Sequence, residues 1–156
     1  MDLSHWLWLA TAAYAIHMIE EFMLEWRDWA RAVIGLPVDW PDFYIANGVV
    51  VVLGIVAANL AAVAPGIALG FAGLMLINAI FFHIAPFIWT RGRFSPGLFT
   101  ALLLLIPVGA ACYWVAHEAG VLTPARIAGS LLLGAALMAT PVILLRIKGR
   151  PYFRQA

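Results

Sequence analysis

An imidazole and two carboxyl groups lie close together near the start of the chain, in the run His17-Met18-Ile19-Glu20-Glu21. The run lies within an apolar segment, residues 5–24, that is long enough to cross the hydrocarbon core as a helix, since about 20 residues suffice. Positions i, i+3 and i+4 of a helix share one face, so His17, Glu20 and Glu21 should point to the same side. Charged groups at this depth cost roughly 2.5–3.5 kcal/mol each, so we expect this face to point inward and to carry a function.

These side chains, together with His83 of a later apolar segment, offer the nitrogen and oxygen ligands that Zn, Fe and Mn prefer. Two histidines and one glutamate would leave coordination positions open, and the small number of ligands favours one metal ion over two. We therefore predict a divalent metal, Zn or Fe, bound by residues that also form the catalytic group: His17, Glu20, Glu21 and His83. Amide and hydroxyl groups expected to support this site belong to Asn47, Asn78, Thr100 and Thr140.

The same residues also suit chemistry without a metal. Two adjacent carboxyl groups in a low-dielectric setting do not both ionise readily, so one would act as an acid while the other, paired with His17, acts as a base. Such a pair would serve an isomerase or cyclase, or a small proton-coupled transporter. Because five spans do not divide into equal halves, a transporter would need to form a homo-oligomer. A third interpretation is a hydrogen-bond network that only holds the helices in register. Each such hydrogen bond stabilises the bundle by about 0.6 kcal/mol, which is less than the free-energy cost of burying the charges.

The elements that must position these residues follow from composition. Of the 156 residues, 65% are hydrophobic and 11% are charged, and the mean hydropathy is +0.97. This is the composition of a multi-pass integral membrane protein. Lysine and arginine are too scattered to form a nucleic-acid-binding patch, and the single cysteine, Cys112, excludes an internal disulfide.

Apolar segments separated by turn residues predict an all-α bundle of five transmembrane helices that forms one domain, residues 1–156. No Lys or Arg precedes the first segment and polar residues interrupt it, so we expect no cleaved signal peptide. Residues 25–41, with their tryptophans, are expected to lie at the membrane surface. Gly66, Gly70 and Gly73 should allow another helix to approach closely. The predicted helices span residues 5–24, 43–62, 66–89, 97–116 and 124–145.

Basic residues predict the orientation. Five spans place the 25–42 loop, the 90–96 loop and the C-terminus on one side of the membrane, together with eight of the nine Lys and Arg residues. The positive-inside rule then places the N-terminus outside and the C-terminus in the cytoplasm, for a protein of the cell's inner membrane. The eight are Arg27, Arg31, Arg91, Arg93, Arg146, Lys148, Arg150 and Arg154, and the ninth is Arg126.

A helix rises 1.5 Å per residue, which converts this topology into depths. Polar residues on all five predicted helices, His17 and His83 among them, fall roughly 4–10 Å to the cytoplasmic side of the midplane, with Asn78 near it. The opposite halves are nearly all apolar. We therefore expect a polar cavity that opens toward the cytoplasmic leaflet and admits a sterol, isoprenoid or acyl chain from the side.

The loop before the fourth predicted helix contains Ser95-Pro96-Gly97. No GxSxG turn surrounds Ser95, which argues against a serine nucleophile. Ser95 is instead expected to cap the helix, with Pro96 at its first position. The free N–H groups of that helix start could receive a phosphate or another anion. The candidate anion site comprises Arg91, Arg93, Ser95 and Gly97.

Three stretches together resemble the HXXEE family of small integral membrane proteins: HMIEE, NAIFFHI with Asn78 and His83, and RFSPGLFTALLLLIPVG. The resemblance covers about residues 5–116 and leaves out the last predicted helix. The family is described as being of unknown function, so the resemblance implies a membrane fold and a set of important positions, but no reaction. The positions that it implies are His17, Glu20, Glu21, Asn78, His83, Ser95, Pro96 and Gly97.

Together these features predict a membrane-embedded metalloenzyme that acts on a lipophilic small molecule. Its expected partners are the lipid bilayer and that molecule, and no nucleic acid. The alternatives are the metal-free isomerase or cyclase and the proton-coupled transporter that uses Glu20 and Glu21.

Overall fold

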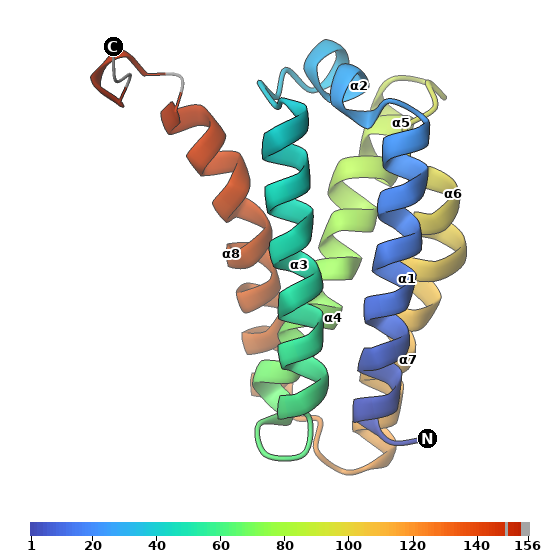
Figure 1. Cartoon of the computed structure of the whole chain (residues 1–156). Coiled ribbons are helices and arrows are strands. Elements are labelled where there is room, and N and C mark those ends of the chain that lie inside the picture. The colour runs from blue at the N-terminus through green and yellow to red at the C-terminus, as the bar shows by residue number, and fades with distance from the viewer. Residues whose placement is uncertain (149, 154–156) are drawn as a thin grey trace.

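The computed structural model describes residues 1–148 and 150–153, and this part of the chain contains helices and no strands. Five long helical segments run up and down the bundle (Figure 1). They are α1 (Leu3–Met23), α3 (Trp40–Leu60), the continuous helix Pro65–Trp89, the continuous helix Leu98–Glu118, and α8 (Pro124–Lys148). The predicted all-helical fold is confirmed.

Four of these helices are long and apolar enough to cross a membrane: α3, Pro65–Trp89, Leu98–Glu118 and α8. The prediction of five such spans differs from this finding at α1. That helix has the required length, 21 residues, but its histidines and glutamates lower its hydropathy. Segment length predicts a span at α1, whereas the hydropathy of this helix does not mark it as one. Composition therefore supports a multi-pass membrane protein with four clearly apolar spans.

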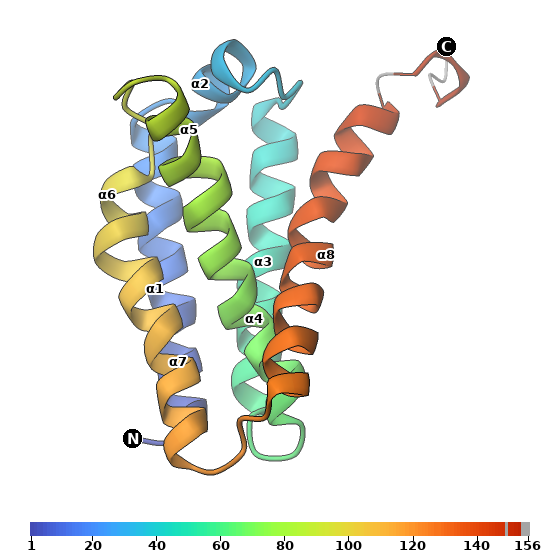
Figure 2. The same ribbon diagram turned by 180° about the vertical axis from the view of Figure 1, so that it is seen from behind.

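The two ends of the bundle differ in charge. The short helix α2 (Trp26–Val33) and the end of α8 lie at one end, and the N-terminus lies at the other (Figures 1 and 2). The first end, called the basic end below, carries Arg27, Arg31, Arg91, Arg93, Arg146, Lys148 and Arg150, whereas Arg126 belongs to the opposite end. Arg154, which the prediction of orientation also used, lies outside the described residues.

Residues 25–41 pack partly into the protein. Trp26 and Trp29 of α2 are each 8% exposed, and they belong to an apolar cluster that also contains Phe43 of α3 and Leu145 of α8. The prediction placed this segment at the membrane surface because tryptophans are enriched there. The charged residues of α2 are half-buried or exposed, so this helix covers the basic end with its apolar face turned inward.

Two prolines locate irregular turns in the middle helices. The helix Pro65–Trp89 consists of α4 (Pro65–Asn78), the π-helical segment η1 (Ala79–Ile84) and α5 (Ala85–Trp89). The helix Leu98–Glu118 consists of α6 (Leu98–Thr100), the π-helical segment η2 (Ala101–Leu105) and α7 (Ile106–Glu118). Pro86 and Pro107 each follow such a segment, and a proline has no N–H for the carbonyl four residues before it. Pro86 thereby frees the carbonyl of Phe82, which accepts a hydrogen bond from the Ser95 hydroxyl at 3.1 Å. Because η1 contains His83, this turn helps to set the direction of a candidate site residue.

Small residues bring α8 against α4. A Cβ atom on Gly134 would contact the backbone nitrogen of Leu74 and would lie 2.6 Å from the backbone carbon of Gly73. A Cβ on Gly73 would in turn lie 2.8 Å from the carbonyl oxygen of Ser130. The predicted packing role of the glycines in the third apolar segment is therefore confirmed for Gly73.

We expect Gly134→Ala to lower the free energy of unfolding by about 1–3 kcal/mol, because the added methyl group meets backbone atoms that cannot move aside. The matched control is Gly129→Ala on the same helix, where a Cβ would have no atom within 4 Å. That substitution should be neutral or stabilising by up to about 1 kcal/mol, owing to the higher helix propensity of alanine. Unfolding in detergent micelles with increasing dodecyl sulfate measures both, and equal effects would contradict the close contact.

Candidate functional site

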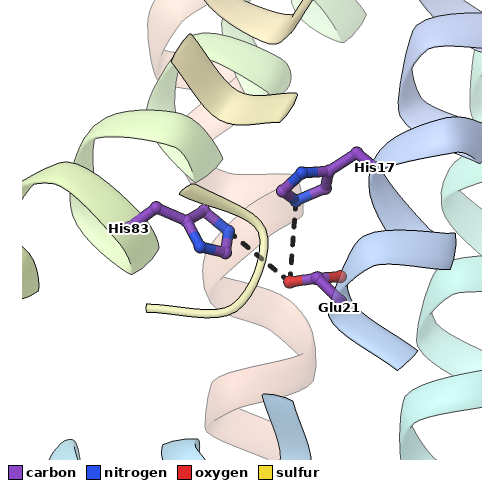
Figure 3. A group of neighbouring side chains, drawn as sticks. All are labelled: His17, Glu21 and His83. Carbon is purple, nitrogen blue, oxygen red and sulfur yellow. Dashed lines mark ion pairs between the residues drawn. The ribbon is translucent and has the colours of Figure 1, made fainter. Parts of the chain in front are cut away.

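Three buried side chains converge inside the bundle, toward the basic end (Figure 3). His17 and Glu21 come from α1, and His83 comes from η1. Glu21 Oε1 lies 3.6 Å from His17 Nε2 and 3.5 Å from His83 Nε2, and the ligand atoms of all three residues lie within 4.8 Å of one another. Both histidines have no exposed surface, and Glu21 is 3% exposed. The structure thus brings together three of the four predicted metal ligands.

Glu20 lies outside this group. Its Oε1 accepts a hydrogen bond from the backbone N–H of Phe99 at 3.2 Å, and its Oε2 accepts one from the N–H of Thr100 at 2.7 Å. A carboxylate at a helix N-terminus satisfies free N–H groups and interacts favourably with the helix dipole. The structure does not group Glu20 with the other three predicted ligands, because adjacent residues on a helix point about 100° apart.

The contacts of Glu20 also correct the prediction for the loop before α6. The helix begins at Leu98, preceded by Gly97 with a φ of +94°, and not at Ser95-Pro96. The N–H groups that were expected to receive an external anion are bonded to the Glu20 carboxylate. Arg91 and Arg93, also assigned to that site, are exposed. The anion at this helix start is therefore a side chain of the protein itself.

Thr100 links Glu20 to His17 and fixes the proton on the histidine ring. Thr100 Oγ1 lies 2.5 Å from Glu20 Oε2 and 2.8 Å from His17 Nδ1. Because a carboxylate accepts hydrogen bonds, the hydroxyl donates to Glu20 and accepts from His17 Nδ1–H. The Nε2 atom of the neutral ring then carries a lone pair. This buried atom has no hydrogen-bond partner among the described residues, which is costly unless something else binds it.

His83 is held from its other side by Ser95. His83 Nδ1 lies 3.1 Å from Ser95 Oγ, whose hydroxyl donates to the free carbonyl of Phe82. In one tautomer Nδ1–H of His83 donates to Ser95, and its Nε2 then faces Glu21 as a second lone pair. His83 Nε2 also lies 3.0 Å from Asn78 Oδ1, so this nitrogen can alternatively carry a proton and donate it to Asn78.

The spacing of these atoms fits a metal ion. Two ligands that each lie 2.0–2.2 Å from a tetrahedral zinc ion are about 3.3–3.6 Å from each other. The distances from Glu21 Oε1 to the two histidine nitrogens, 3.6 Å and 3.5 Å, agree with that value. Asn78 Oδ1 is an additional oxygen within reach. Two of the three ligand pairs therefore have the spacing of a zinc site, and the third pair lies within 4.8 Å, so the group could hold one divalent cation.

Gly97 allows the three side chains to meet. Its φ of +94° lies in the region that favours glycine, and a Cβ there would lie 2.6 Å from His83 Cε1, 2.7 Å from His17 Cε1 and 3.0 Å from Glu21 Cγ. No other residue type offers both the backbone conformation and the space.

These residues coincide with the motif of a recognised family. Residues 8–115 match the family described as "Protein of unknown function with HXXEE motif". The chain belongs to the HXXEE family. It is also similar to the uncharacterized protein YrkK of Bacillus subtilis (strain 168), with 30% identity over 144 residues that cover 86% of this chain and 90% of that protein. No solved structure matches the chain.

The two glutamates of the HXXEE motif have separate roles in this structure. Glu21 faces the two histidines, whereas Glu20 positions Thr100 and, through it, His17. The family match ends at residue 115, so α8 lies beyond it.

Of the predicted supporting residues, Thr100 and Asn78 reach the site and the other two do not. Asn47 Nδ2 donates to the carbonyl of Phe43, and Thr140 Oγ1 donates to the carbonyl of Ala136, each within its own helix. Tyr14 also reaches the site and was not among the predicted residues; its hydroxyl oxygen accepts a hydrogen bond from Asn78 Nδ2 at 3.2 Å. Its position three residues before His17, on the same helix face, was the available signal.

A largely apolar cavity of about 630 Å³ adjoins the site. Residues of α3 and α8 form much of its wall, including Asn47 and Thr140. Tyr14, Glu21 and Asn78 line it next to the histidines. A polar group that could hold a cation thus lies beside a largely apolar space.

Proposed function

We propose that this HXXEE protein is an intramembrane metalloenzyme that acts on a lipophilic small molecule. The observation that supports this best is the convergence of three buried ligand atoms next to an apolar cavity, one of them without a hydrogen-bond partner in the described part of the chain. His17, Glu21 and His83 would hold the metal. Their nitrogen and oxygen atoms favour Zn or Fe.

The bound metal would supply Lewis acidity toward an oxygen atom of the substrate. The protein's own residues then have defined tasks. Glu20 and Thr100 orient the ring of His17, and Ser95 orients the ring of His83. Tyr14 and Asn78 place hydrogen-bonding groups between the histidines and the cavity. Burial of all three ligands keeps bulk water away from the reacting atoms.

Placement in the membrane is part of the proposal. We place α1 as a fifth spanning helix, because its polar residues His17 and Glu21 are buried while its apolar Ile16 and Ile19 are 50% and 61% exposed. The positive-inside rule would put the basic end in the cytoplasm and the N-terminus outside, in the inner membrane of the cell. The cavity, which extends to the basic end at Lys148, would then open toward the cytoplasmic leaflet.

A metal-free acid–base enzyme is the second candidate, and one contact favours it. The bond between His83 Nε2 and Asn78 Oδ1 at 3.0 Å gives both nitrogens of His83 a partner in the absence of a metal. Glu21 and His17 would then exchange a proton with an isomerase or cyclase substrate.

Metal analysis of the protein purified in detergent without chelators separates the two candidates. We expect about one equivalent of metal per chain and a lower melting temperature after chelation, since a ligand at 100 times its Kd stabilises by about 2.7 kcal/mol. A folded protein that contains no metal and takes up neither Zn²⁺ nor Fe²⁺ on titration would overturn the metal centre and favour acid–base chemistry.

Replacing Glu20 tests its positioning role. We expect Glu20→Gln to weaken metal affinity by about 10–100-fold, as changes to groups that orient metal ligands typically do. The variant should also lose about 1 kcal/mol of stability, because the start of α6 loses its charged cap. Glu118→Gln, at an exposed carboxyl group, is the control. A competition titration with a chromogenic chelator measures affinity, and unchanged metal affinity in Glu20→Gln would contradict the role.

A further inference from the structure

The cavity beside the site lies where two helices separate. Both views show α8 leaning away from α3 toward the basic end (Figures 1 and 2). Close contact between α8 and α4 occurs at Gly134, in the other half of α8. Cavity-lining side chains follow α3 from Asp42 to Leu53 and α8 from Leu137 to Lys148. The space is thus a groove between two helices that are both apolar enough to span a membrane. We call it the α3–α8 groove.

The rim of the α3–α8 groove is apolar and exposed. Ile45 and Val49 of α3 line the groove and are 68% and 53% exposed, and Leu144 of α8 lines it and is 59% exposed. In a membrane these side chains would contact lipid chains. A ligand that crosses this rim must therefore tolerate hydrocarbon surroundings, which favours access from the bilayer over access from water.

The charges in the groove argue against an anionic ligand. Lys148 Nζ, at the basic end of the groove, lies 2.9 Å and 3.1 Å from the two carboxylate oxygens of Asp42 and is therefore already paired. The third charged residue that lines the groove is Glu21, which is 3% exposed. A carboxylate or phosphate brought beside Glu21 would lose its hydration without gaining an unpaired cation from the described residues of the lining.

Hydrogen-bond donors remain available in the groove. Trp26 Nε1–H, on a residue that lines it, has no partner among the described residues, and two further donors lie next to the histidines. Tyr14 accepts a hydrogen bond from Asn78, and within the described residues its own hydroxyl hydrogen is not used. The second hydrogen of Asn78 Nδ2 has only the weak acceptor Met138 Sδ, at 3.8 Å. Both groups are nearly fully buried, so donors in this setting are well suited to an oxygen atom of a ligand.

We infer that the α3–α8 groove binds an uncharged, single-chain lipophile that carries a carbonyl or hydroxyl oxygen, and that this molecule enters sideways from the bilayer. Its oxygen would be bound by Tyr14 and Asn78, next to His17, Glu21 and His83. The cavity volume, about 630 Å³, is within the roughly 300–1,000 Å³ of small-molecule sites and suits one chain better than a two-chain phospholipid. The inference rests on the proposed function and narrows its substrate to an uncharged molecule with one chain and a hydrogen-bonding oxygen.

Photolabelling of the full chain in phosphatidylcholine vesicles tests the inference. The probes are a long-chain methyl ketone with a diazirine at mid-chain and a carboxylic acid with the same chain and diazirine. We expect the ketone to label groove residues such as Val50, Leu53 and Met138, identified by mass spectrometry of peptides. The carboxylate probe, at a pH where it is ionised, should label them roughly tenfold less, because its charge would be desolvated unpaired. Equal labelling by both probes would overturn the assignment to an uncharged ligand.

A pair of variants locates the labelled site. Ala46 lines the groove, so Ala46→Phe should reduce ketone labelling by roughly tenfold by filling the space. Val52 lies on the same helix, is 57% exposed and does not line the groove, so Val52→Phe should leave labelling unchanged. Tyr14→Phe should reduce labelling by the ketone but not by a matched hydrocarbon probe. Labelling that is confined to lipid-facing residues, or that Ala46→Phe does not change, would overturn the groove site.

Metal content measured on the same samples separates this inference from the proposed function. Ala46→Phe should retain the wild-type amount of metal, which would show that the variant is folded and that the metal site does not depend on an open groove. A protein that binds metal but is not labelled in the groove would overturn the lipophile site alone. A protein that is labelled there and binds no metal would overturn the metal centre alone.

Discussion

His17→Ala and His83→Ala are each expected to abolish stoichiometric metal binding. Each substitution removes one of the three converging ligand atoms. Both histidines are fully buried, so a water molecule cannot easily replace the lost ligand. The loss of affinity should exceed the roughly 100-fold upper effect of changing a group that only orients a ligand. Metal per chain after gel filtration, followed by titration against a chelator of known affinity, measures the loss.

The control for these variants is His117→Ala, because His117 is exposed and lies at the end of α7, at the opposite end of the bundle. It should retain the wild-type metal content. Helical circular dichroism and a single gel-filtration peak would show that His17→Ala and His83→Ala remain folded. Folded variants that still bind one metal ion per chain would mean that the metal is held elsewhere.

The helical fold could be predicted because long apolar runs alternate with short polar loops, and such runs form helices in a membrane where backbone groups must pair internally. The status of α1 could not be decided in the same way. Its length indicates a span while its histidines and glutamates lower its hydropathy, and only packing shows that His17 and Glu21 are turned toward the other helices.

Depth along the helices was a good guide to the site, and rotation about the helix axes was not. The rise per residue places His17 and His83 at similar levels, and the structure brings their ring centroids to 4.7 Å. Asn47 and Thr140 were predicted at comparable depths, yet they bond to carbonyls of their own helices. Depth alone does not distinguish a side chain that faces the histidines from one that faces the groove.

Long-range contacts account for the remaining errors. Ser95 was expected to cap the helix that follows it, but Pro86 leaves the carbonyl of Phe82 free and the Ser95 hydroxyl binds there. The helix start is capped instead by Glu20, 79 positions before Phe99. Neither partner is near in the sequence, so local capping rules could not identify them.

Gly97→Ala is expected to disrupt the site and destabilise the protein more than any other single-methyl change considered above. Two costs combine. A non-glycine residue at a positive φ costs about 1–2 kcal/mol, and forcing a methyl group against both histidines adds about 1–3 kcal/mol of overpacking. Because those contacts are the Cε1 atoms of His17 and His83, at 2.7 Å and 2.6 Å, relief of the clash must move the rings that carry the ligand atoms. Metal affinity should therefore fall together with stability.

Gly92→Ala separates the two costs. Gly92 has a φ of +95°, almost equal to that of Gly97, but a Cβ there would meet only Phe87, at 3.9 Å or more. This variant should lose about 1–2 kcal/mol from backbone strain alone and keep its metal. Chemical unfolding and metal titration of both variants give the comparison. If Gly92→Ala and Gly97→Ala lose equal stability and both retain metal, then Gly97 is needed only for the turn. Metal loss confined to Gly97→Ala would show that the two histidines, from separate helices, can meet Glu21 only when position 97 has no side chain.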